Sequence, residues 1–101
     1  MPEMIYLVHI HLSPRRPGAL LPSECASVVA GSASRPGVAH VVVHSLAEPY
    51  PVVGLYLQEA TLERAEAFAR RIWERAVVAE PALGDWELVR AEVPLLQVDE
   101  E

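Results

Sequence analysis

The sequence predicts an α+β domain in which strands and helices follow one another in the order β-α-β-β-α-β. Two observations support this order: four short runs are rich in β-forming residues, and two other stretches carry apolar residues at helical spacing. Breaks that contain proline or glycine separate these segments. With 101 residues, 51% of them apolar and 22% charged, we expect a single folded domain that spans residues 1–101.

The first two elements are a strand and a short helix. Residues 4–12 form an apolar run rich in β-forming side chains, and the segment 13–18, with two prolines and a glycine, ends it. This pattern predicts a first strand followed by a loop. Ser23 is a typical helix N-cap and Gly31 a typical stop signal, so we expect a short helix between them.

Two more β-rich runs, 38–46 and 52–58, are joined by a segment that contains Pro49 and Pro51. Proline cannot donate to a strand ladder, so this connection predicts a hairpin with a longer loop.

The longest helix is predicted from Thr61, a suitable N-cap, to the break at Pro81. Its apolar residues recur at three- and four-residue spacing and form one stripe: Leu62, Ala65, Phe68, Ala69, Ile72, Trp73 and Ala76. After a turn at 82–85, residues 86–93 alternate as a last strand, and we expect residues 94–101 to form a loose acidic tail.

This element order is that of the ferredoxin-like fold, an antiparallel four-stranded sheet with two helices on one face. The first and third strands are expected in the centre of the sheet, and the second face is expected to be open.

The period of two along a strand assigns each side chain to one face. We expect the core to receive Met4, Tyr6, Val8, Ile10, Leu12, Val41, Val43, Val53, Leu55, Leu57, Val89, Ala91 and Val93. The open face then receives Ile5, Leu7, His9, His11, His40, Val42, His44, Val52, Gly54, Tyr56, Gln58, Trp86, Leu88, Arg90 and Glu92. A face that combines large apolar groups with all four histidines is too apolar to stay solvated. A second copy of the chain is therefore the expected partner.

The stretch 40–65, a hairpin that runs directly into a helix, resembles the corresponding part of the dimeric α/β-barrel superfamily, which includes the antibiotic-biosynthesis monooxygenase-like proteins. Its members pair their open sheet faces into a dimeric barrel. They include cofactor-independent oxygenases, polyketide cyclases, haem-binding enzymes and ligand-sensing modules, so the resemblance implies a fold and a dimer but does not select one activity.

Two functions fit these observations. The leading hypothesis is a small homodimeric module that binds a small molecule or a partner protein. Its candidate ligand-binding residues are His9, His11, His40, His44, Tyr56 and Trp86. The alternative is a cofactor-independent enzyme, a monooxygenase or cyclase, that acts on an apolar or polyketide-like substrate. Its candidate catalytic residues are His9, His11, Tyr56, Arg90 and Glu92.

Metal and cofactor sites are not expected. His9 and His11 share a face about 7 Å apart, but His40 and His44 lie about 13 Å apart along their strand. The two pairs belong to strands that the third strand should separate by about 10 Å, and no cysteine or aspartate completes a ligand set. The single cysteine, Cys25, is expected to be a small core residue.

Charge excludes two classes of partner. The chain has 14 acidic and 8 basic residues and a net charge of −6. Binding to nucleic acid or to an anionic membrane depends on clustered positive charge, so neither is expected. The first residues have no basic segment, and the apolar run that follows them is interrupted by His9 and His11, so we expect no signal peptide and a cytoplasmic location.

Overall fold

The computed structural model describes residues 3–33 and 35–94 and shows a ferredoxin-like α+β fold. One antiparallel sheet has the strand order β2-β3-β1-β4, with β1 at Met4–Pro14, β2 at Val38–His44, β3 at Val52–Glu59 and β4 at Trp86–Glu92. The helices are α1 at Cys25–Gly31 and α2 at Leu62–Ala79, and a 3-10 turn, η1, occupies Pro81–Asp85. The predicted element order and the central position of β1 and β3 are confirmed.

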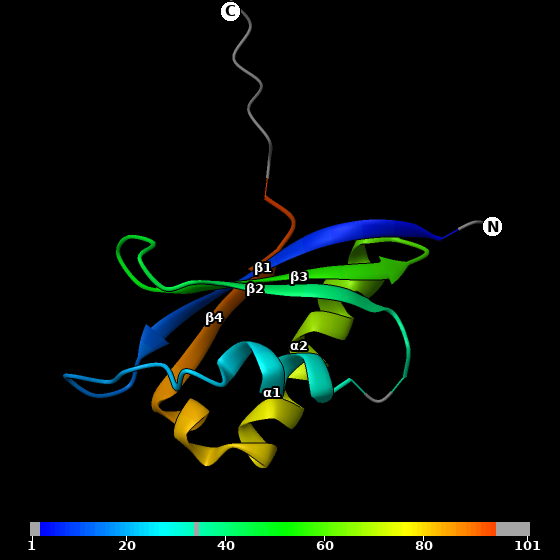
Figure 1. Ribbon diagram of the computed structural model, residues 1–101. Helices are drawn as coiled ribbons and strands as arrows, with labels where there is room; N and C mark the ends of the chain where they lie inside the picture. The colour runs from blue at the N-terminus through cyan, green and yellow to red at the C-terminus, as the bar shows by residue number, and fades with distance from the viewer. Residues whose placement is uncertain (1–2, 34, 95–101) are drawn as a thin grey trace, which may run out of the picture.

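Both helices lie on the same side of the sheet, and no helix of the described residues lies on the opposite face (Figure 1). This arrangement positions the candidate site, because every second side chain of each strand points away from the helices. Of the predicted acidic tail, residues 95–101 lie outside the described part of the chain.

Helix α2 begins where its cap was expected, because the Thr61 side chain accepts a hydrogen bond of 3.1 Å from the Arg64 backbone N–H. Its predicted stripe is buried from Ala65 to Ala76. Leu62 is the exception at 40% exposed, because it is the first helical residue and lies at the end of the packed stripe. None of the helices within the described residues is long and apolar enough to cross a membrane.

Helix α1 begins later than predicted. The expected N-cap, Ser23, makes no capping hydrogen bond, and the helix starts at Cys25 after Glu24. A backbone turn replaces the side-chain cap, since the Cys25 N–H donates to the carbonyl of Pro22 at 3.1 Å. The predicted end at Gly31 is confirmed.

The core lies between the sheet and the helices. Val8, Ile10 and Leu12 of β1 and the alternate residues of β3 are buried as predicted. Met4 was predicted to join them, but it is 60% exposed. It is the first residue of β1, and β4 pairs with β1 only from His9 onward, so the sheet is narrower at this end.

A bulge in β4 changes which side chains reach the core. Leu12 pairs with Leu88 while His11 pairs with Arg90, so Val89 is an extra residue in the ladder. On the N-terminal side of the bulge, each β4 side chain therefore points to the opposite face from the one that an uninterrupted alternation predicts. The prediction that Trp86 and Leu88 lie on the open face and Val89 in the core is therefore wrong: Trp86 is 5% exposed, Leu88 packs against the core and Val89 is 52% exposed.

Candidate functional site

Three histidines form one cluster on the open face, which we call the histidine cluster: His9, His11 and His44. The ring centroids of His9 and His11 are 6.1 Å apart, and those of His9 and His44 are 5.7 Å apart, both edge-on. His9 and His11 are half-buried and His44 is exposed. Imidazoles from two different strands therefore meet around the central ring of His9.

The contact between His9 and His44 corrects the expectation that the third strand keeps these histidines apart. Gly54 of β3 pairs with His9 on one side and with Val42 of β2 on the other. A Cβ atom at Gly54 would lie 3.5 Å from His9 Cδ2 and 3.7 Å from His44 Nε2. Because glycine has no side chain, the two rings approach each other across the strand between them.

A pocket of about 510 Å³ lies beside the histidine cluster, and we call it the loop pocket. The chain between β2 and β3 forms one wall and strand residues form the other. The lining residues are His9, Val43, His44, Ser45, Leu46, Ala47 and Val52. The pocket combines two imidazoles with aliphatic walls, a composition suited to a small, mainly apolar molecule that has a polar group.

The other end of the cluster is connected to charged groups of β4. His11 Nε2 lies 3.2 Å from Glu92 Oε2, without the alignment of a hydrogen bond, and Arg90 Nε lies 3.1 Å from the same oxygen. The hydrogen bond from Arg90 is the main cause that lowers the pKa of Glu92. Glu92 is therefore ionised near neutral pH and places a negative charge beside His11.

The remaining predicted site residues lie elsewhere. His40 and Tyr56 form a separate pair with ring centroids 6.0 Å apart on the open face. Trp86, predicted to bind a ligand on that face, lies in the core because of the β4 bulge. The site thus brings together five of the predicted residues: His9, His11, His44, Arg90 and Glu92.

Sequence reasoning missed Gly54 and the loop residues that line the pocket. The sequence contained one indication of the role of Gly54, since a glycine inside an apolar strand often marks a close approach of neighbouring groups. The position of Ser45, Leu46 and Ala47 had no such indication, because it depends on how the loop folds back against the sheet.

The pKa of His9 is lowered from its ordinary value of 6.5, chiefly because partial burial disfavours the charged form. The nearby rings of His44 and His11 lower it further, and Glu92 partly opposes this effect. His9 is therefore neutral at pH 7, and its imidazole can accept a proton or a hydrogen bond from a molecule in the loop pocket.

Metal binding and thiol chemistry depend on how the His, Cys, Asp and Glu side chains are grouped and buried. Among residues 3–33 and 35–94, no three His, Cys, Asp or Glu side chains are grouped so that they could hold a metal ion. Cys25 is 2% exposed, and burial raises its pKa to about 11. Its thiol is protonated near neutral pH, which fits the predicted role as a core residue.

We expect His9 to make folding stability dependent on pH. Because its pKa is lower in the folded than in the unfolded chain, the unfolded chain binds more protons as the pH falls below about 6.5. The stability contribution is complete above this pH and declines toward the lowered pKa. His9→Gln should therefore lose less free energy of unfolding than the wild type between about pH 7.5 and 5 in urea titrations.

The matched control is His40→Gln, which removes an exposed imidazole outside the histidine cluster. It should keep the wild-type slope of stability against pH. Equal slopes for the wild type and His9→Gln would contradict the assignment of this pH dependence to His9.

Comparison of the chain with protein-family models, with curated proteins and with solved structures finds no match. The class of the protein is therefore defined by its fold and its site. It is a ferredoxin-like α+β domain whose open sheet face carries a cluster of histidines beside a partly apolar pocket.

Proposed function

We propose that this chain is a homodimeric binding module, in which a second copy covers the open sheet face and a small molecule occupies the loop pocket. The proposal places the chain among the dimeric α/β-barrel proteins, which its hairpin and following helix resemble. The observation that carries it is the composition of the open face, which combines exposed and half-buried apolar side chains with the histidine cluster.

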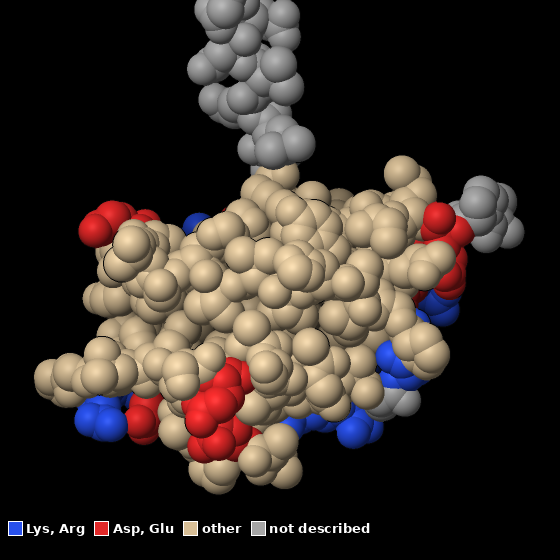
Figure 2. Space-filling view, in the orientation of Figure 1, with Lys and Arg blue, Asp and Glu red and all other residues tan. Residues whose placement is uncertain are grey.

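The open face has the character of an interface. Ile5 is 54% exposed and Tyr56 36% exposed, and Leu7, Val42 and Val52 are partly buried beside them. Strand β2 contains no charged residue, and Figure 2 shows an uncharged surface over it, with charged atoms gathered at the ends of the molecule and toward the helices. Depletion of charge around exposed aromatic and aliphatic groups is typical of the buried core of an interface.

The same face favours a second copy over an unrelated partner. The charged residues of this face among those described are Glu87, Arg90 and Glu92, which carry both signs of charge and all lie on β4. In a two-fold symmetric pair the same patch meets itself, so a cation and an anion on one patch allow ion pairs between the copies. An interface with a single sign of charge would repel its own copy.

The test is the oligomeric state of wild type and Ile5→Asp at micromolar concentration by sedimentation velocity. We expect a wild-type dimer and a dissociation constant raised at least about 100-fold in Ile5→Asp, because a buried carboxylate without a partner costs several kcal/mol. Ile5 is exposed in the single chain, so the substitution leaves the fold intact.

Val78→Asp is the matched control, since Val78 is 82% exposed on α2, on the opposite side of the molecule. It should remain a dimer. A monomeric wild type, or equal weakening by both substitutions, would contradict the proposed interface.

The position and ionisation of His9 also favour a second function, that of a cofactor-independent enzyme. A neutral imidazole at the wall of a partly apolar pocket is suited to act as a general base on an apolar substrate. A dimer structure separates the two functions. A closed pocket of about 300 Å³ or more with polar groups directed into it favours the enzyme, whereas a filled interface excludes it.

A further inference from the structure

A second pocket, which we call the arginine pocket, lies on the helix side of the molecule and has a volume of about 490 Å³. It is lined by Glu3, Arg35, Glu59, Arg64, Ala67 and Arg71. Three of the eight basic residues of the chain meet here. Val52 borders the loop pocket and Glu59 the arginine pocket, at opposite ends of β3 and so about 23 Å apart. The arginine pocket is therefore separate from the site described above.

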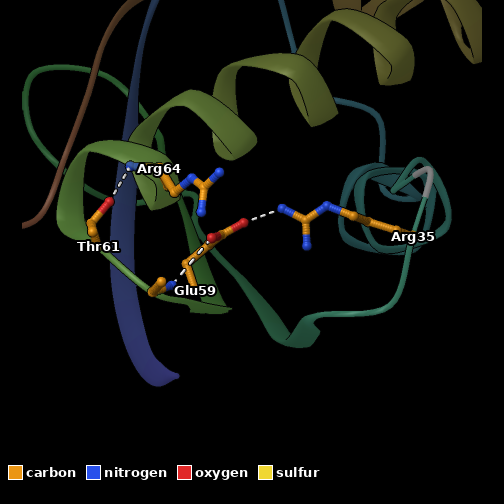
Figure 3. A network of polar contacts seen from close by, with 5 residues as sticks. Arg35, Glu59, Thr61 and Arg64 are labelled. Carbon is orange, nitrogen blue, oxygen red and sulfur yellow. Dashed lines mark hydrogen bonds and ion pairs between the residues drawn. The ribbon is translucent and has the colours of Figure 1, made fainter. Parts of the chain in front are cut away.

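One of the three arginines is already neutralised. Figure 3 shows Arg35 and Arg64 approaching Glu59 from opposite sides, with the ion pair formed between Arg35 and Glu59. The Glu59 side chain is 8% exposed and also accepts a hydrogen bond from the Ala60 N–H. The Arg35 guanidinium also lies over the Phe68 ring, with its Cζ atom 4.0 Å from the ring centroid, and this contact stabilises its position. This arrangement fixes Arg35 at the wall of the pocket.

The other two arginines keep their hydrogen-bonding capacity. Within the part of the chain that the structure describes, neither Arg64 nor Arg71 forms an ion pair. The pocket holds three guanidinium groups and two carboxylates, a local excess of one positive charge in a chain of net charge −6. Guanidinium groups that line a cavity raise the positive potential inside it, which favours an anionic ligand.

The helix sets the spacing of these two arginines. Arg64 and Arg71 are seven residues apart on α2, so they project from the same face at a separation of about 10.5 Å along the axis. Ala67 lies between them and leaves the space between the two side chains open. A planar guanidinium on each side presents paired N–H donors, a geometry that matches the oxygens of phosphate or carboxylate groups.

We propose that the arginine pocket binds a small organic anion, whose phosphate or carboxylate group is held between Arg64 and Arg71. The volume of the pocket exceeds that of a bare ion, so the rest of the molecule occupies the space toward Arg35 and Glu3. Because the walls are charged except at Ala67, this part of the ligand is polar.

The experiment titrates the full chain with inorganic phosphate and, separately, with acetate, at constant ionic strength maintained with sodium chloride. Amide chemical shifts report where each anion binds and with what dissociation constant. We expect saturable shifts at residues around Arg64 and Arg71 with at least one anion. Saturation by phosphate alone identifies a phosphate ligand, and saturation by acetate alone identifies a carboxylate ligand.

The variant Arg64→Gln/Arg71→Gln should raise the dissociation constant at least about tenfold, because charged hydrogen bonds to the anion are lost. Arg64→Lys/Arg71→Lys keeps the charge but loses the paired donors. Its dissociation constant should lie between those of the glutamine variant and the wild type. Arg75→Gln, an exposed arginine one turn beyond the pocket, removes one charge and should change binding less than about twofold. Absence of saturation by both anions, or an equal loss in Arg75→Gln, would overturn the proposal.

Discussion

Trp86→Ala is expected to lower the free energy of unfolding by about 3 kcal/mol, at the low end of the range for truncating a buried tryptophan. Trp86 is 5% exposed and lies in the core cluster, so its removal leaves a cavity. Its indole Nε1 has no hydrogen-bond partner among residues 3–33 and 35–94, and loss of this unsatisfied donor offsets part of the cost. Urea denaturation monitored by circular dichroism measures the change.

Val89→Ala tests the same β4 bulge, because Val89 is its extra residue. Val89 is 52% exposed, so its truncation should change stability by less than about 0.5 kcal/mol. A strand without the bulge would place Val89 in the core and Trp86 on the open face. The reverse result, with Val89→Ala more destabilising than Trp86→Ala, would therefore show that β4 has no bulge at this position.

Phe68→Ala should lower the free energy of unfolding by about 3–5 kcal/mol. Phe68 is 2% exposed in the core, and its ring also supports the Arg35 guanidinium. The chain passes close to the same ring at Gly37, whose φ of +136° is a conformation that favours glycine. Loss of the ring removes both the core packing and the support under the segment that leads into β2. Thermal and urea denaturation measure the change.

Phe68→Leu separates these two effects. Leucine fills most of the space in the core but has no aromatic face for Arg35, so we expect a cost of about 1–2 kcal/mol. A cost below about 1 kcal/mol for Phe68→Ala would show that this ring is not part of the core.

The candidate site was partly predictable from the sequence. The period of two along β1 correctly placed His9 and His11 on the open face, and the same rule placed His44 there. The proximity of His44 to His9 was not predictable. It depends on Gly54 lying between them in the register of three strands, and a sequence pattern shows only which face a residue occupies, not which residue lies opposite.

The arginine pocket was hidden for a similar reason. Arg64 and Arg71 lie in a helical segment where arginines and glutamates are interleaved, a pattern typical of an ordinary solvated helix. The pocket exists because Arg35, nearly thirty residues earlier in the chain, is held against Glu59 at the end of β3. No local pattern links these three segments.

The sequence by itself determined the order of the elements, the extent and buried stripe of α2, and the faces of β1, β2 and β3. These features follow from local periodicity, from the Thr61 cap and from the prolines and glycines between elements, all of which act within a few residues. The tertiary structure alone decided the faces of β4, the meeting of His9 with His44 and the assembly of the arginine pocket. Each of these depends on strand register or on packing between segments far apart in the chain, where the total fit of the core, rather than any local preference, selects the arrangement.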